Sequence, residues 1–77
     1  MSHVKLFLGE LQKLREMASE LKQRIERGDL ASARLGVRPV RLQQAATMMK
    51  VLLLTKEEKS RFRGSIRALR RLHLNDA

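Results

Sequence analysis

The chain has 77 residues, enough for one small domain whose core hides only about 60% of the unfolded surface. Its 17 Lys and Arg against 8 Asp and Glu give a formal net charge of +9 at pH 7. It has no cysteine, which excludes disulfides and thiolate chemistry. No stretch approaches the roughly 20 apolar residues of a membrane span, and the first residues do not resemble a signal peptide. We therefore expect a cytoplasmic protein with an anionic partner.

Residues 3–27 carry an amphipathic repeat that predicts a long helix. Its apolar positions alternate at spacings of three and four, the a/d pattern of three heptads; they are Val4, Phe7, Leu11, Leu14, Ala18, Leu21 and Ile25. Two interpretations of this seam stay open. It forms a dimeric coiled coil, or it packs on other helices of the same chain, where similar spacing serves. Gly28 then supplies the left-handed residue that commonly ends a helix.

Residues 29–54 make up the centre of the predicted fold. Asp29 is a candidate N-cap for a short helix over residues 30–35, which Gly36 ends. Pro39 suits the first position of a second helix, which extends to about residue 54. Beyond Thr47 this helix is apolar on all sides, so we expect it to be buried on more than one face.

The run from Ala31 to Ala45 resembles the helix-turn-helix of bacterial DNA-binding regulators. The resemblance depends on a small residue on the first helix, an apolar residue before the turn, and a turn glycine followed by another apolar residue; these are Ser32, Leu35, Gly36 and Val37. Leu42 and Ala45 would pack the second helix against the first. The match covers residues 29–45. It implies that Val40, Gln43, Gln44 and Thr47 face the major groove, with base contacts from Gln43, Gln44 and Thr47. Phosphate contacts would come from Arg34, Arg38 and Arg41.

Residues 55–74 predict one basic amphipathic helix that begins with a capping box of Thr55 and Glu58. Its apolar arc holds Phe62, Ile66, Leu69 and Leu72. At about 100° per residue, six cations share an arc of roughly 120°; they are Lys56, Lys59, Arg63, Arg67, Arg70 and Arg71. Like charges this close repel one another, so the row is easiest to explain if a phosphate backbone lies against it. A solvated face that keeps the protein soluble is the alternative.

The sequence offers little for catalysis. Its two histidines, His3 and His73, have no Cys, Asp or Glu at a metal-ligand or relay spacing. It has no Gly-rich phosphate loop. We therefore expect no enzyme, no cofactor and no metal site.

Together these patterns predict an all-α protein, with residues 1–77 folded as a single small bundle of three to four helices that forms a dimer. We expect a small basic nucleic-acid-binding protein, a transcriptional or phage- or plasmid-type regulator that holds duplex DNA or structured RNA by its phosphates. The scarcity of aromatic residues argues against binding single strands by base stacking. The alternative is a helical protein-interaction module, such as an anti-activator, adaptor or chaperone. It would use the heptad seam and the apolar second helix on a helical or acidic protein partner.

Overall fold

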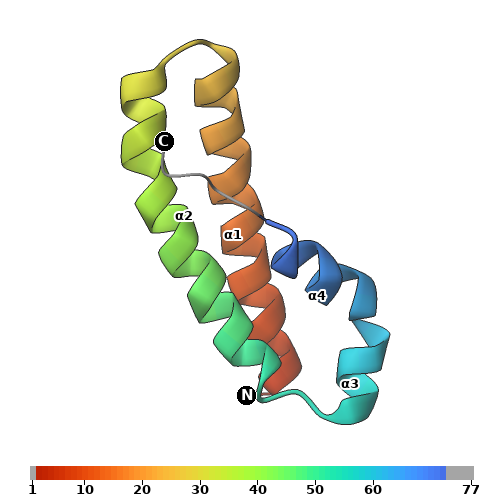
Figure 1. Ribbon diagram of the computed structural model, residues 1–77. Coiled ribbons are helices and arrows are strands. Elements are labelled where there is room, and N and C mark those ends of the chain that lie inside the picture. Colours follow the sequence, from red (N-terminus) through yellow and green to blue (C-terminus); the bar gives the residue numbers. More distant parts are fainter. Residues whose placement is uncertain (1, 73–77) are drawn as a thin grey trace.

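The computed structural model describes residues 2–72, and over that range the chain is helical without strands (Figure 1). The four helices are α1 (His3–Glu26), α2 (Leu30–Val51), α3 (Lys56–Arg61) and α4 (Arg63–Arg70). The first two form an antiparallel hairpin, and α3 and α4 lie along one side of it. The prediction of an all-α fold is therefore confirmed. None of the helices over residues 2–72 combines the length and hydropathy that crossing a membrane requires.

The turn between α1 and α2 follows from its local sequence. Gly28 has a φ of 77°, which only glycine adopts without strain. The N–H groups of Gly28 and Asp29 donate to the carbonyl oxygens of Ile25 and Arg24, both at 3.0 Å. The Asp29 carboxylate then accepts a hydrogen bond from the Ser32 N–H at 3.2 Å. The predicted helix end and N-cap are thus confirmed, and they direct α2 back along α1.

The centre of the chain differs from the prediction, because α2 extends from Leu30 to Val51 without interruption. The predicted helix end at Gly36 and helix start at Pro39 are wrong. Gly36 lies where α2 approaches α1 closely, and an added Cβ would come within 3.1 Å of side-chain atoms of Leu21 and Arg24. The glycine therefore serves helix packing. Without its turn, the helix-turn-helix geometry that the resemblance implies is absent from residues 29–45.

Pro39 is tolerated inside α2 for a reason that its surroundings supply. A proline has no N–H, so it leaves the carbonyl oxygen four residues earlier, on Leu35, without its helical partner. Leu35 is 80% exposed, so water can reach that part of the helix. The cost of the missing hydrogen bond is smallest on such an exposed face.

The last predicted helix is divided in two. Its capping box is confirmed, since the Glu58 N–H donates to Thr55 Oγ1 at 3.1 Å and the Thr55 N–H donates to Glu58 Oε1 at 2.8 Å. The helix is interrupted at Phe62, with φ −102° and ψ 21°, whose ring lies 5.6 Å from that of Phe7 between centroids. The prediction of one continuous helix is wrong at this residue. Its predicted end at residue 74 lies outside the described residues.

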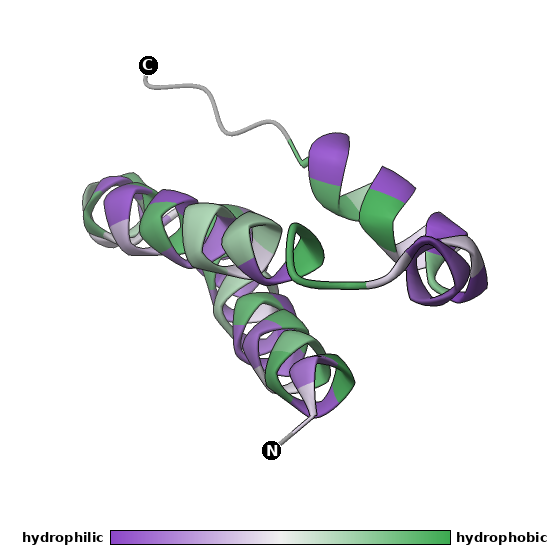
Figure 2. Cartoon of the chain, turned by 90° about the horizontal axis from the view of Figure 1, so that it is seen from below, coloured by the Kyte–Doolittle hydropathy of each residue, from purple (hydrophilic) through white to green (hydrophobic). Residues whose placement is uncertain are grey.

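The core combines one face of each of α1, α2 and α4. Its buried hydrophobic residues are Phe7, Leu11, Leu14, Leu21, Ala33, Val40, Val51, Leu54, Ile66 and Leu69. Four of the predicted seam positions are therefore buried within a single copy of the chain, Val4 packs partly buried against them, and Ile25 at the far end of α1 is half exposed. Figure 2 shows how hydrophilic and hydrophobic residues alternate around the helices.

Candidate nucleic-acid interface

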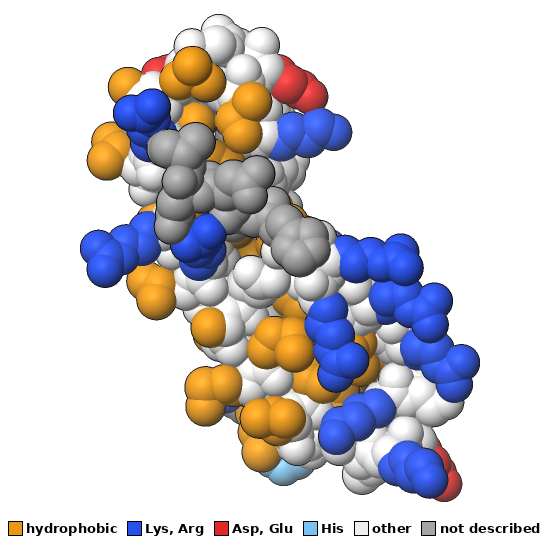
Figure 3. All heavy atoms as spheres, in the orientation of Figure 1, with side chains coloured by type: hydrophobic (Ala, Val, Ile, Leu, Met, Phe, Trp, Pro, Cys, Tyr) orange, Lys and Arg blue, Asp and Glu red, His pale blue; other side chains and the backbone are white. Residues whose placement is uncertain are grey.

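Six cations of α3 and α4 form what we call the basic row: Lys56, Lys59, Arg63, Arg67, Arg70 and Arg71. All six are exposed. In α4 the buried Ile66 and Leu69 face the hairpin. Arg63, Arg67 and Arg70 follow one another at spacings of four and three on an exposed arc roughly 100° around the helix from that buried side. Figure 3 shows Lys and Arg side chains gathered over the flank that α3 and α4 form. The break at Phe62 thus leaves all six cations of the predicted row exposed.

The charges of the basic row are not neutralised by acids within residues 2–72. The ion pairs described there join Lys13 to Glu10 at 3.7 Å and Lys22 to Glu26 at 4.0 Å, both on α1. Within the described part of the chain, the acids nearest to the row in sequence are Glu57 and Glu58. Hydrogen bonds from Thr55 engage the Glu58 carboxylate and hold its pKa below the usual range. The flank therefore presents a concentrated positive potential to anything that approaches it.

A single side chain fixes the far end of the basic row to the hairpin. Gln44 Nε2, on α2, donates to the carbonyl oxygens of Leu69 at 2.9 Å and Leu72 at 3.1 Å. The last carbonyl groups of a helix lack their regular helical partners. The Leu69 carbonyl oxygen accepts a long bond of 3.4 Å from the Leu72 N–H as well, so the amide gives it a closer donor and also engages the carbonyl of Leu72, just beyond the helix. Arg67 and Arg70 in the same last turn also suit the negative end of the helix dipole.

The residues predicted to contact bases do not face outward as a set. Thr47 is fully buried and Val40 is 2% exposed, so their predicted outward orientation is wrong. Both lie on the side of α2 that packs on α1. Gln43 Nε2 donates to the Glu10 backbone carbonyl oxygen at 3.1 Å and to the Glu10 carboxylate. Gln43, Gln44 and Thr47 thus hold helices together, and their amides and hydroxyl already have partners inside the fold.

The hydrogen bonds around Glu10 join α1 to α2 through polar groups. The bond from Gln43 is the main cause that lowers the pKa of the Glu10 carboxyl, and Lys13 and Lys50 lower it further against the opposing effect of burial. Thr47 Oγ1 donates to the Gln43 carbonyl oxygen at 2.8 Å. These contacts were not predicted from the sequence. One available signal was the spacing of Gln44 and Thr47, which places them on the same heptad face of α2 as Val40 and Val51 and so indicates an inward orientation.

The remaining predicted phosphate contacts, Arg34, Arg38 and Arg41, are exposed on α2. They lie ten, six and three residues before Gln44, whose amide meets the end of α4. They belong to α2 and are not part of the basic row.

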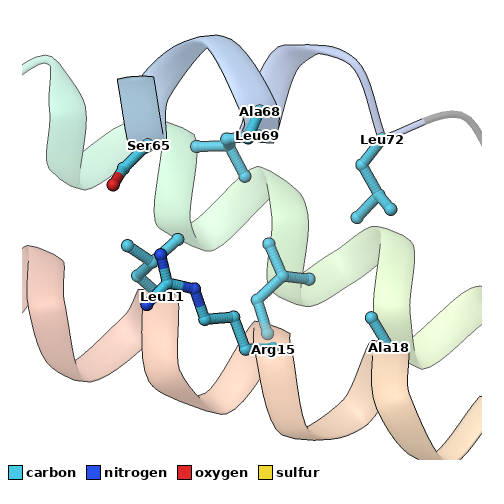
Figure 4. A pocket seen from close by; sticks show the side chains of 8 residues that line it. Leu11, Arg15, Ala18, Ser65, Ala68, Leu69 and Leu72 are labelled. Atoms are coloured by element: carbon cyan, nitrogen blue, oxygen red, sulfur yellow. The ribbon is translucent and has the colours of Figure 1, made fainter. Parts of the chain in front are cut away.

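A small cleft of about 140 Å³ lies between α1 and α4 (Figure 4). Its lining is mostly apolar, with the Arg15 side chain extending toward the end where Ser65 lies. Cofactor and ligand pockets are typically ≈ 300–1,000 Å³, so this cleft is small for such a molecule. Within residues 2–72 no cluster of three His, Cys, Asp or Glu side chains is placed to hold a metal ion. A wider and more open hollow of about 660 Å³ lies between Leu72 and the second half of α1, from Arg15 to Glu26. The basic row is the surface on which charges of one sign gather, and we take it as the candidate site.

Comparison with known proteins finds no family model, no curated protein and no solved structure that matches this chain.

Proposed function

We propose that this protein binds nucleic acid by its phosphates through the basic row of α3 and α4. The observation that carries the proposal is the row of six exposed cations that no acid within residues 2–72 pairs with. Such a row repels itself in isolation, and a phosphate backbone removes that repulsion and releases condensed counterions. The proposed class is the one expected from the sequence, a small regulator of the transcriptional, phage or plasmid type that acts inside the cell.

The proposed binding is led by phosphates, with little reading of base sequence. Side chains that discriminate bases need free donors or acceptors at the groove. Gln43, Gln44 and Thr47 use theirs within the fold. Only two Phe and no Tyr or Trp occur in the chain, which disfavours stacking on single strands. The proposed ligand is therefore a duplex, either DNA or structured RNA, and sequence preference is weak.

The test is the salt dependence of duplex binding, measured by fluorescence anisotropy with labelled DNA and RNA duplexes. If all six cations contact phosphate, the slope of log K against log salt is about −5, from about −0.9 per contact. Replacing Arg63, Arg67 and Arg70 by Gln should make that slope less negative by about 3.

The matched control removes the same charge from another surface. Lys5, Lys22 and Arg27 are exposed cations on or next to α1 and do not belong to the basic row. Their triple replacement by Gln lowers the net charge equally and should leave most of the slope in place. Equal losses in the two triple variants would mean that overall charge, not the basic row, attracts the duplex, and would reject the proposal.

A further inference from the structure

A second regular surface lies on α2. Starting from Ala31, the positions reached by alternating steps of four and three residues are all exposed, and the last of them is the C-cap residue of α2. We call this set the outer face; it consists of Ala31, Leu35, Arg38, Leu42, Ala45, Met49 and Leu52. Four of the large exposed hydrophobics of residues 2–72 belong to it. Leu35 is 80% exposed, Leu42 and Met49 66% each, and Leu52 73%. Large apolar side chains in a regular seam are unusual on the surface of a protein that stays alone.

The outer face lies opposite the side of α2 that packs on α1. The packed positions Ala33, Val40 and Thr47 are each two residues away from outer-face positions, which is about 200° around a helix. The helix therefore has two heptad seams on opposite sides, one buried inside the chain and one exposed. In Figure 3 hydrophobic side chains are visible along the α2 side of the molecule, beside the flank of the basic row.

The area of the outer face is close to what a specific dimer needs. A fully exposed Leu or Met side chain offers roughly 100 Å² of apolar surface, so the four large side chains offer about 300 Å² in one copy and about 600 Å² in two. Apolar atoms make up about 60% of a typical interface, which gives a total near the roughly 1,000 Å² threshold for a specific interface. An interface of this size is at the low end of those that are specific, so we expect the association to be reversible.

The charges on α2 decide how two copies would meet. The helix has no Asp or Glu, and Arg38 lies within the outer face. In a parallel pair the two Arg38 side chains would share one layer. In an antiparallel pair with Leu42 opposite Ala45 of the second copy, they lie about 16 Å apart along the axis. That is about twice the screening length of roughly 8 Å at physiological salt.

The same antiparallel register matches the sizes of the side chains. Leu35 meets Leu52 of the second copy, Leu42 meets the small Ala45, and Met49 meets the aliphatic stem of Arg38. Each of these layers occurs twice because the arrangement has two-fold symmetry.

We propose that the outer face of α2 is the site at which a second copy of this chain docks, antiparallel, to form a two-fold dimer. The dimer leaves both basic rows outside the shared surface, so it does not depend on the proposed nucleic-acid binding. It also covers apolar surface that a chain of this size leaves exposed.

The mass of the full chain, measured by sedimentation equilibrium from low to high micromolar concentration, tests the proposal. We expect a reversible monomer–dimer equilibrium. Leu42→Asp should raise the dissociation constant by at least about a hundredfold, because it places a carboxylate in the seam of both copies. Leu30→Asp is the matched control, since Leu30 is 61% exposed and lies outside the outer face. Circular dichroism should find both variants as helical as the parent, because neither side chain is in the core.

Disulfide formation tests the orientation, because the chain has no cysteine of its own. Leu35 and Leu52 are about 25 Å apart on one helix. Only an antiparallel pair brings their Cβ atoms to the roughly 4 Å that a disulfide needs. A mixture of the Leu35→Cys and Leu52→Cys variants should therefore cross-link to each other and not to themselves.

Three results would overturn the proposal. The first is a monomer at every concentration. The second is a dimer that Leu42→Asp leaves intact, which would assign association to another surface. The third is cross-linking of each cysteine variant only to itself, which would mean a parallel pair. A monomer whose outer face instead binds an acidic helical peptide would assign that face to a different protein.

Discussion

Replacing Gln44 by Met tests most sharply how the basic row is held in place. The two side chains are similar in length and volume, so packing between α2 and α4 is largely kept. Methionine has no N–H to donate, so the carbonyl oxygens of Leu69 and Leu72 lose the bonds of 2.9 and 3.1 Å that they accept from the amide. The end of α4 then has only its apolar contacts to hold it against the hairpin.

The expected loss follows from those two bonds. Each contributes a net of about 0.5–1.5 kcal/mol, so the free energy of unfolding should fall by about 1–3 kcal/mol. A protein of this size has a total stability of roughly 4–12 kcal/mol, so the loss is a large share of it.

Urea denaturation followed by circular dichroism measures this loss, and amide hydrogen exchange locates it. Exchange should accelerate most in α4, because local opening there becomes easier. The control is Gln12→Met, since Gln12 donates only to Glu16 on the exposed side of α1 and should change stability by no more than about 0.5 kcal/mol.

Duplex binding by the same variant distinguishes the two roles considered for Gln44. If the side chain positions α4, affinity for all duplex sequences should fall together. If it reads bases, as the helix-turn-helix resemblance implies, stability should stay unchanged and the order of preferred sequences should change. Unchanged stability with unchanged exchange in α4 would refute the positioning role.

Further predictions concern glycines and pH. Gly9 lies inside α1 with open space where a Cβ would be, so Gly9→Ala should raise the free energy of unfolding by about 0.5–1 kcal/mol. Gly28→Ala should lower it by about 1 kcal/mol or more, because Gly28 has a φ of 77°. Melting temperatures of the two variants that shift in the same direction would contradict this. The carboxyls of Glu10 and Glu58 have lowered pKa values, so their stabilising effect is complete above the unfolded pKa of about 4.3 and is lost as the pH falls through the lower folded values. Glu10→Gln should weaken this acid dependence in urea titrations at a series of pH values, and an unchanged pH profile would count against the Glu10 contacts.

Features that depend on neighbouring residues could be predicted from the sequence. The turn at Gly28, the N-cap Asp29 and the capping box at Thr55 use contacts within a few residues, and all three form as expected. The spacing of Phe7, Leu11, Leu14 and Leu21 likewise identified buried positions of α1. Such signals are local because backbone geometry and helical periodicity determine them.

Features that depend on distant residues could not be predicted. Gly36 and Pro39 have local preferences that favour a break, yet contacts with Leu21 and Arg24 across the hairpin accompany a continuous helix. Phe62, where the last predicted helix breaks, packs its ring 5.6 Å from that of Phe7, near the other end of the chain. Gln43 finds its partner 33 residues away at Glu10. Nothing in the local pattern around these residues identifies such partners. The cations of the candidate site could therefore be predicted from the sequence, but the polar contacts that hold it to the hairpin could not.

The most direct test of the proposed function is the salt slope of duplex binding in the triple variant of Arg63, Arg67 and Arg70. Our account predicts a slope less negative than that of the parent by about 3, with the triple variant of Lys5, Lys22 and Arg27 close to the parent. Slopes that are the same in all three proteins would contradict it.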